Sequence, residues 1–148
     1  MASDERAIEG LLYAYAERID LGDFEGVADL FAHGLIAPFP GASAEQRVEG
    51  RDAVLALYRG TTRLYEDGTP HTKHITSNVI VDVEGERASA RSYYTVLQQV
   101  GELPLQPIIS GRYHDRFHRI DGAWWFDARV IHVDLVGDLS RHLLIDLG

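Results

Sequence analysis

Asp20 and His74 are the two side chains whose type and position most favour proton-transfer chemistry. The apolar series Ile8, Leu12 and Ala16 steps by four residues and continues at Asp20, which places this carboxylate on or beside the buried stripe of a predicted helix. Asp20 also falls in the last helical turn, where the helix dipole disfavours negative charge. Either Asp20 hydrogen-bonds the turn that follows, or a partner holds it inward.

His74 opens the stretch KHITSNVIVDVEG, in which His74, Thr76 and Asn78 alternate onto one side of a predicted strand. Two interpretations remain open: a solvated strand face, or a pocket wall whose histidine does chemistry. In the second case a carboxylate such as Asp20 would fix the tautomer of the imidazole and stabilise the imidazolium. Sequence spacing by itself leaves open whether the two side chains meet.

Composition narrows the class of protein. A chain of 148 residues with 45% hydrophobic and 25% charged residues is typical of one folded domain, here residues 1–148. The net charge of −9, with Lys73 as the single lysine, argues against nucleic-acid partners and membrane surfaces. The N-terminus lacks a signal-peptide core, so we expect a soluble, cytoplasmic protein.

Metal and thiol chemistry are not expected. The chain has no cysteine, which excludes disulfides and thiolate nucleophiles. Its seven histidines include the stretches HTKH and HDRFH, whose spacings on predicted strands are not typical of metal ligands. We therefore predict a site without metal or cofactor.

The elements that must position Asp20 and His74 follow from hydrophobic periodicity. Helices are predicted over 3–21, 23–32 and 51–66, with short strands near 34–37 and 47–50. Four long β-type runs follow, over 71–83, 87–100, 106–120 and 123–136, with Asp121-Gly122 as a hairpin turn. Helices before an antiparallel meander indicate an α+β fold, with three helices packed on a strongly curved sheet that forms a cone-shaped barrel. The apolar tail Leu139, Leu143, Leu144 and Ile145 suggests a covering helix or an oligomer contact.

Three stretches carry a resemblance to a known family: AERIDLGDFEGVADLFA, then KHITSNVIVDVEGERASARSYYTV, then GRYHDRFHRIDGAWWFDARV. Over roughly residues 4–136 the chain resembles the SnoaL-like branch of the nuclear-transport-factor-two-like superfamily, which has a cystatin-like α+β fold. Within it, the pattern is most similar to scytalone dehydratase, bile acid 7α-dehydratase and hexachlorocyclohexane dehydrochlorinase.

The resemblance implies roles for particular residues. It implies that Asp20 and His74 form a base dyad inside the cone, and that Arg129 stabilises a departing anion. Tyr15 matches an aromatic or cationic site group of two of these enzymes, and Tyr113 falls at a pocket-lining position of scytalone dehydratase.

Two further candidates come from the residues themselves. We expect Tyr58 and Asn78 to line the substrate pocket, although ordinary core or strand-edge roles remain open. The direction in which the Arg129 side chain points is left open. Strict alternation puts Arg129 on the opposite face of its strand from Trp124 and Phe126, and the sequence does not show which of these two faces lines the cavity.

The sequence also departs from the dehydratase pattern. Ile19 stands where scytalone dehydratase has a water-holding tyrosine, and Gln98 and Gln99 stand where the dehydratases carry a second acid or histidine. A glutamine can orient a substrate oxygen but cannot protonate a leaving hydroxyl. Proton abstraction is therefore the half-reaction that the sequence supports best.

We accordingly expect a cofactor-independent lyase or isomerase, of the dehydratase or dehydrohalogenase type, acting on a small hydrophobic cyclic substrate. The alternatives are a polyketide-cyclase-type aldol closure, or a non-catalytic role as the small subunit of a ring-hydroxylating dioxygenase or a ligand-binding protein. The resemblance further implies a homo-oligomer, either a dimer or a trimer.

Overall fold

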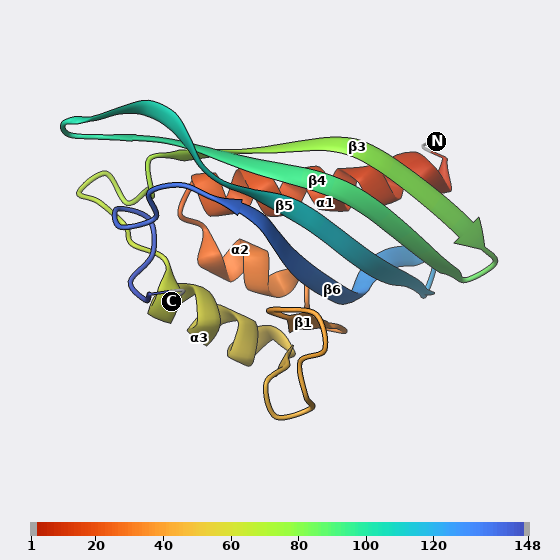
Figure 1. Cartoon of the computed structure of the whole chain (residues 1–148). Coiled ribbons are helices and arrows are strands. Elements are labelled where there is room, and N and C mark those ends of the chain that lie inside the picture. Colours follow the sequence, from red (N-terminus) through yellow and green to blue (C-terminus); the bar gives the residue numbers. More distant parts are fainter. Residues whose placement is uncertain (1–2, 147–148) are drawn as a thin grey trace.

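The computed structural model of the chain describes residues 3–146 and contains nine helices and strands within that range (Figure 1). The first half carries α1 (Asp4–Asp20), α2 (Phe24–Asp29), β1 (Leu35–Ala37), β2 (Val48–Glu49) and α3 (Arg51–Thr61). The second half consists of β3 (Thr72–Glu84), β4 (Arg87–Val100), β5 (Leu103–Ile120) and β6 (Ala123–Val136). The sequence prediction placed these elements correctly, but α3 is five residues shorter than the predicted 51–66 and β5 begins three residues before the predicted 106.

The strands form one curved sheet in the order β2-β1-β6-β5-β4-β3. All neighbouring pairs are antiparallel except β1 and β6, which run parallel. The three helices lie on one side of the sheet and leave the other side uncovered (Figure 1). This arrangement confirms the predicted α+β fold with helices on a mostly antiparallel, curved sheet.

Helix α1 carries the apolar stripe that the sequence predicted. Ser3 caps it, because its side chain accepts a hydrogen bond from the backbone N–H of Arg6 at 3.2 Å. Ile8, Leu12 and Tyr15 are among the residues that the helix buries against the sheet. The helix ends at Asp20, so this carboxylate emerges at the edge of the core, beside β3.

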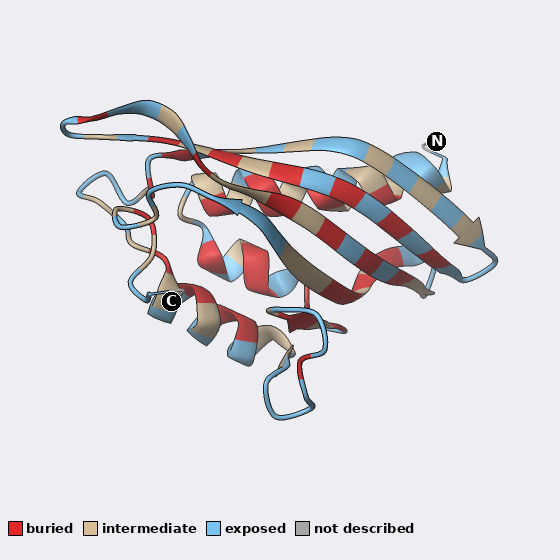
Figure 2. Cartoon of the chain, viewed as in Figure 1, coloured by how far each residue is buried: buried red, intermediate tan, exposed pale blue. Residues whose placement is uncertain are grey.

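Strand β4 shows the regular alternation of a sheet with one covered face: its residues Ala88, Ala90, Ser92, Tyr94, Val96 and Gln98 are all buried (Figure 2). Bulges break this alternation in β3 and in β6. In β3 the register shifts between Ser77 and Ile80, where Asn78 has a left-handed backbone with φ of 54°. Between β5 and β6 it shifts again, because Phe117 pairs with Phe126 but Arg116 pairs with Ala128.

The C-terminal segment, residues 137–146, forms turns rather than the covering helix that was one of the two expectations. It crosses back to the end of α3, where Leu143 bridges to Thr62 and the backbone N–H of Leu144 donates to the carbonyl of Thr61 at 2.9 Å. It thereby closes one end of the space between α3 and the sheet. Among residues 3–146, no helix is both long and apolar enough to cross a membrane.

Candidate active site

The Asp20 carboxylate at the end of α1 accepts three hydrogen bonds from β3. Its Oδ1 accepts from Thr72 Oγ1 at 2.8 Å and lies 2.7 Å from His74 Nδ1, while its Oδ2 accepts from the His74 backbone N–H at 2.8 Å. The strand therefore fixes both the carboxylate and the imidazole that faces it. Of the two interpretations of Asp20, the structure agrees with the second, in which partner groups, here on Thr72 and His74, hold the carboxylate inward.

The contact with Asp20 fixes the tautomer of the His74 ring. The side chains of His74 and Asp20 are 8% and 11% exposed, so little water competes for their contact. A carboxylate accepts and cannot donate, so in the neutral ring the proton belongs on His74 Nδ1 and the lone pair on Nε2. A histidine held in this tautomer by a carboxylate can accept a proton at Nε2 and keep the resulting charge paired.

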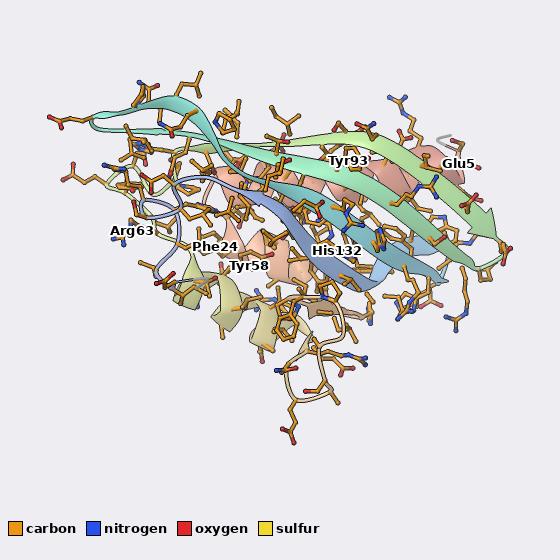
Figure 3. All side chains as sticks on the ribbon, viewed as in Figure 1. Glu5, Phe24, Tyr58, Arg63, Tyr93 and His132 are labelled. Atoms are coloured by element: carbon orange, nitrogen blue, oxygen red, sulfur yellow. The ribbon has the colours of Figure 1, made fainter. Side chains whose placement is uncertain are left out.

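His74 lines a cavity of about 200 Å³ between the helices and the sheet. The walls are mostly apolar and aromatic, with Tyr15, Tyr58, Tyr94 and Tyr113 contributing four rings. Figure 3 shows Tyr58 pointing from α3 toward the sheet. An apolar cavity of about 150 Å³ in another protein admits benzene, so this cavity has the size for one substituted ring.

The tyrosines form a connected cluster. The hydroxyls of Tyr15 and Tyr58 share a short hydrogen bond, and the Tyr94 and Tyr113 rings stack with centroids 4.4 Å apart. Burial raises the pKa of Tyr58 and of Tyr113 well above the usual value, so both hydroxyls stay protonated. They can donate hydrogen bonds but are not bases. The structure thus brings three predicted binding residues, Tyr15, Tyr58 and Tyr113, to the same cavity as His74.

Arg129 lies behind this cluster rather than on the cavity wall. It is fully buried and forms two hydrogen bonds to Asp115, from Nε at 2.8 Å and from Nη2 at 2.9 Å. Its guanidinium carbon lies 3.6 Å from the ring centroid of Tyr113 and 4.2 Å from that of Tyr15. Burial opposes the charge of Arg129, but the field and hydrogen bonds of Asp115 outweigh it and raise the pKa of the guanidinium.

The facing of Arg129, left open by alternation, follows from the bulge in β6. The extra residue at Asp127 changes the parity of the strand, so that Arg129 and Phe126 both point toward the helices. The bulge in β3 has the opposite consequence for Asn78, which is exposed and does not line the cavity. The expectation that Asn78 shares the pocket side of His74 is therefore corrected.

His142 is a site residue that the sequence analysis did not identify. It lines the same cavity as His74, and the two ring centroids are 6.1 Å apart. Burial, helped by the nearby His74, lowers the pKa of His142 to about 4, so its ring is neutral near pH 7. The one available signal was the apolar tail around it, which pointed to a covering segment but not to the inward facing of one histidine.

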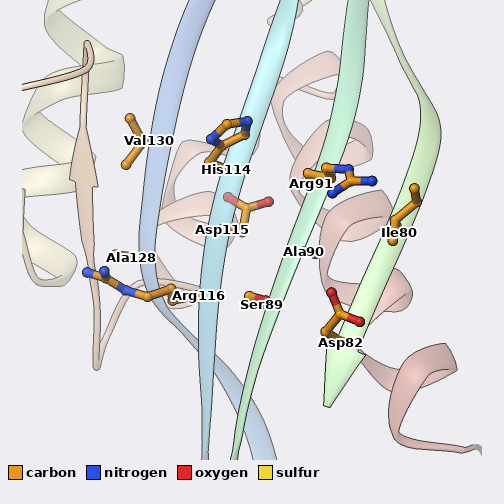
Figure 4. Close-up of a pocket in the computed structure, with 10 residues that line it drawn as sticks. All are labelled: Ile80, Asp82, Ser89, Ala90, Arg91, His114, Asp115, Arg116, Ala128 and Val130. Atoms are coloured by element: carbon orange, nitrogen blue, oxygen red, sulfur yellow. The ribbon is translucent and has the colours of Figure 1, made fainter. Parts of the chain in front are cut away.

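A second hollow, of about 360 Å³, lies on the uncovered face of the sheet (Figure 4). Exposed side chains such as Asp82, Arg91 and Arg116 surround it. The strands separate it from His74, so it does not belong to the Asp20–His74 site. Within residues 3–146, no three histidine, aspartate or glutamate side chains converge as metal ligands would.

Comparison with known proteins identifies the family. The model of the SnoaL-like domain matches residues 1–130, and the chain belongs to this family. No curated protein matches the chain. Among solved structures, an NTF2-like protein with a cystatin-like fold from Novosphingobium aromaticivorans is 23% identical, with a TM-score of 0.72 over 88% of this chain and 81% of that chain.

Two further structures from the same organism are similar to this chain. A proposed scytalone dehydratase is 27% identical, with a TM-score of 0.70 over 90% of this chain and 85% of that chain. The beta subunit of a proposed aromatic-ring-hydroxylating dioxygenase is 21% identical, with a TM-score of 0.71 over 95% of this chain and 96% of that chain. The second likeness is one of fold alone.

Proposed function

We propose that this protein is a cofactor-independent enzyme that removes a proton from a carbon atom of a small hydrophobic cyclic substrate. The observation that carries the proposal is the 2.7 Å contact between Asp20 and His74 at the wall of an apolar cavity. His74 Nε2 takes the proton, and the electrons of the broken C–H bond move toward a neighbouring carbonyl or leaving group. Asp20 keeps the imidazolium paired while negative charge develops on the substrate.

The tyrosines complete this assignment. Tyr113 and Tyr15 present aromatic side chains to the cavity, and the guanidinium of Arg129, which does not line the cavity, lies over both rings. Arg129 accordingly acts as a positioning residue that supplies positive charge behind the wall, without touching the substrate. The 27% identity to a proposed scytalone dehydratase favours elimination of water as the outcome, ahead of isomerisation or aldol closure, and the proton that His74 Nε2 has taken is then given to the leaving hydroxyl.

Hydrogen–deuterium exchange tests the proton-abstraction step without knowledge of the final product. The protein is incubated in D₂O with a panel of one-ring and two-ring ketones and β-hydroxyketones, and loss of the α-proton signal is followed by NMR. We expect exchange above the buffer rate, reduced about 10²–10⁴-fold in His74→Ala, since a general base contributes that much.

His71→Gln provides the matched control. His71 lies three residues from His74 but is exposed and pairs with Asp67 at 3.0 Å, away from the cavity. Its replacement should leave exchange unchanged. Exchange that survives in His74→Ala, or a panel in which the wild type exchanges no faster than His74→Ala, would contradict the proposal.

We also propose that the protein self-associates through the uncovered face of the sheet. Large apolar side chains are exposed along its strands: Ile75, Ile80, Tyr93 and Leu135. Several large exposed apolar side chains on one face of a sheet favour a contact with another copy of the chain. Light scattering coupled to gel filtration should give a multiple of 16.5 kDa, and a monomer at micromolar concentration would contradict this expectation.

A further inference from the structure

We propose that His142 is a second functional imidazole of the site, which donates an N–H hydrogen bond to an oxygen atom of the substrate. The inference rests on the proposed function, because it assigns the group that holds the substrate while His74 removes the proton. Both rings line the cavity, with centroids 6.1 Å apart and an interplanar angle of 63°. One small ring substrate can therefore contact both imidazoles at once.

The ring of His142 has a nitrogen available for a hydrogen bond to a ligand, whereas most neighbouring polar groups already have partners. The hydroxyls of Tyr15 and Tyr58 bond to each other, and the hydroxyl of Tyr94 donates to the backbone carbonyl of His132 at 3.0 Å. By contrast, Nδ1 of His142 is buried and has no hydrogen-bond partner in the part of the chain that the structure describes. A buried unpaired polar atom is costly, and a ligand oxygen bound to the ring would recover part of that cost.

The two histidines divide the work by their surroundings. His74 has a carboxylate at 2.7 Å and can carry positive charge, whereas His142 has no carboxylate in hydrogen-bond contact among the described residues. A second positive charge beside a protonated His74 would be strongly disfavoured. His142 therefore stays neutral through the reaction, and a neutral imidazole still has one N–H to donate. It stabilises negative charge on oxygen without competing for the proton.

The backbone on either side of His142 is held in place. The Gln98 side chain, 1% exposed, donates to the carbonyl of Arg141 at 3.0 Å, and the same amide nitrogen donates to the carbonyl of Pro70 at 3.0 Å. The carbonyl of His142 itself accepts from the backbone N–H of Arg63 at 2.8 Å. These bonds anchor the segment to β4 and to the chain after α3, so the ring is positioned in advance of binding.

The experiment compares two ligands of nearly equal shape, phenol and toluene, which differ in one hydroxyl. Their dissociation constants are measured by NMR titration against the wild type, His142→Leu and His142→Gln. We expect the wild type to prefer phenol, and His142→Leu to lose about threefold to tenfold of that preference, as one hydrogen bond predicts. His142→Gln retains an N–H donor and should keep part of the preference.

Toluene is the internal control for folding and cavity shape. An equal loss of affinity for phenol and toluene in His142→Leu, or an unchanged preference for phenol, would overturn the inference. His142 would then only line the cavity and would not donate a hydrogen bond to the ligand. The His74→Ala exchange assay separates the two claims. Exchange that depends on His74, together with an unchanged phenol preference in His142→Leu, would leave the proposed function standing while this inference fails.

Discussion

Two carboxylates in this protein each bind a basic side chain, and a comparison of the two pairs distinguishes a role in proton transfer from a role in stabilising the fold. Asp20 with His74 and Asp115 with Arg129 are both close, multiply hydrogen-bonded pairs. The first is slightly exposed and reaches the cavity wall, whereas both side chains of the second are fully buried behind the tyrosines. Histidine can exchange a proton near neutral pH and arginine cannot. The first pair is therefore suited to turnover and the second to fixing the fold and its internal charge.

The largest effect on stability is expected at the arginine pair. Asp115→Ala leaves Arg129 as an unpaired charge in the core, which should lower the free energy of unfolding by about 3–5 kcal/mol. Urea denaturation followed by tryptophan fluorescence measures the change. In the control, Asp115→Leu combined with Arg129→Met removes both charges and should recover most of the loss. An Asp115→Ala protein as stable as the wild type would contradict the assignment of the Asp115–Arg129 pair to stabilising the fold.

The histidine region should make stability depend on pH. Burial lowers the pKa of His142 to about 4 in the folded protein, against 6.5 for an ordinary histidine. Between these values the unfolded chain binds more protons, so acidification favours unfolding. Stability is therefore lost as the pH falls from about 6.5 to 4, and by the linkage relation the contribution of His142 is on the order of 3 kcal/mol.

His142→Gln isolates that contribution, because glutamine does not titrate in this range. We expect the unfolding free energy of the variant to decline less than that of the wild type between pH 6.5 and pH 4. The measurement is a series of urea titrations at half-unit pH intervals. Parallel curves for the two proteins would show that His142 does not carry the pH dependence.

The sequence was informative where hydrophobic patterns are regular. The helices, the four long strands and the place of Asp20 on or beside the buried stripe of α1 could be predicted from spacing. The bulge at Asn78 could not, because one extra residue reverses which side chains face the core and leaves no mark on composition. The direction of the Arg129 side chain could not be predicted for the same reason, because it depends on the bulge at Asp127.

The remaining site residues depend on contacts between distant segments. His142 joins the site only because residues 137–146 fold back against β4 and the end of α3, through bonds such as that from Gln98 to the Arg141 carbonyl. No local pattern encodes that return. Asp115 was missed likewise, since its partner Arg129 lies on the neighbouring strand and pairing of strands must be known first.

The smallest stability change, and the sharpest test of the contrast, is expected for Asp20→Asn. The amide keeps the shape of the carboxylate and one acceptor, so the cost should be about 1–3 kcal/mol, less than for Asp115→Ala. Its effect on catalysis should be much larger. An amide N–H facing His74 Nδ1 favours the tautomer with the proton on Nε2, which removes the lone pair that accepts the substrate proton.

Exchange of the ketone panel in D₂O should therefore fall about 10²–10⁴-fold in Asp20→Asn. In the Asp115→Leu, Arg129→Met double variant it should fall by no more than about tenfold, the scale of one cation–π contact such as that of Arg129 with Tyr113. Asp20→Asn should therefore lose exchange activity with only a small loss of stability, whereas the double variant should keep most of both. If the double variant loses exchange as fully as Asp20→Asn does, then Arg129 takes part in the reaction directly. The assignment of catalysis to the Asp20–His74 pair and of stability to the Asp115–Arg129 pair would then be wrong.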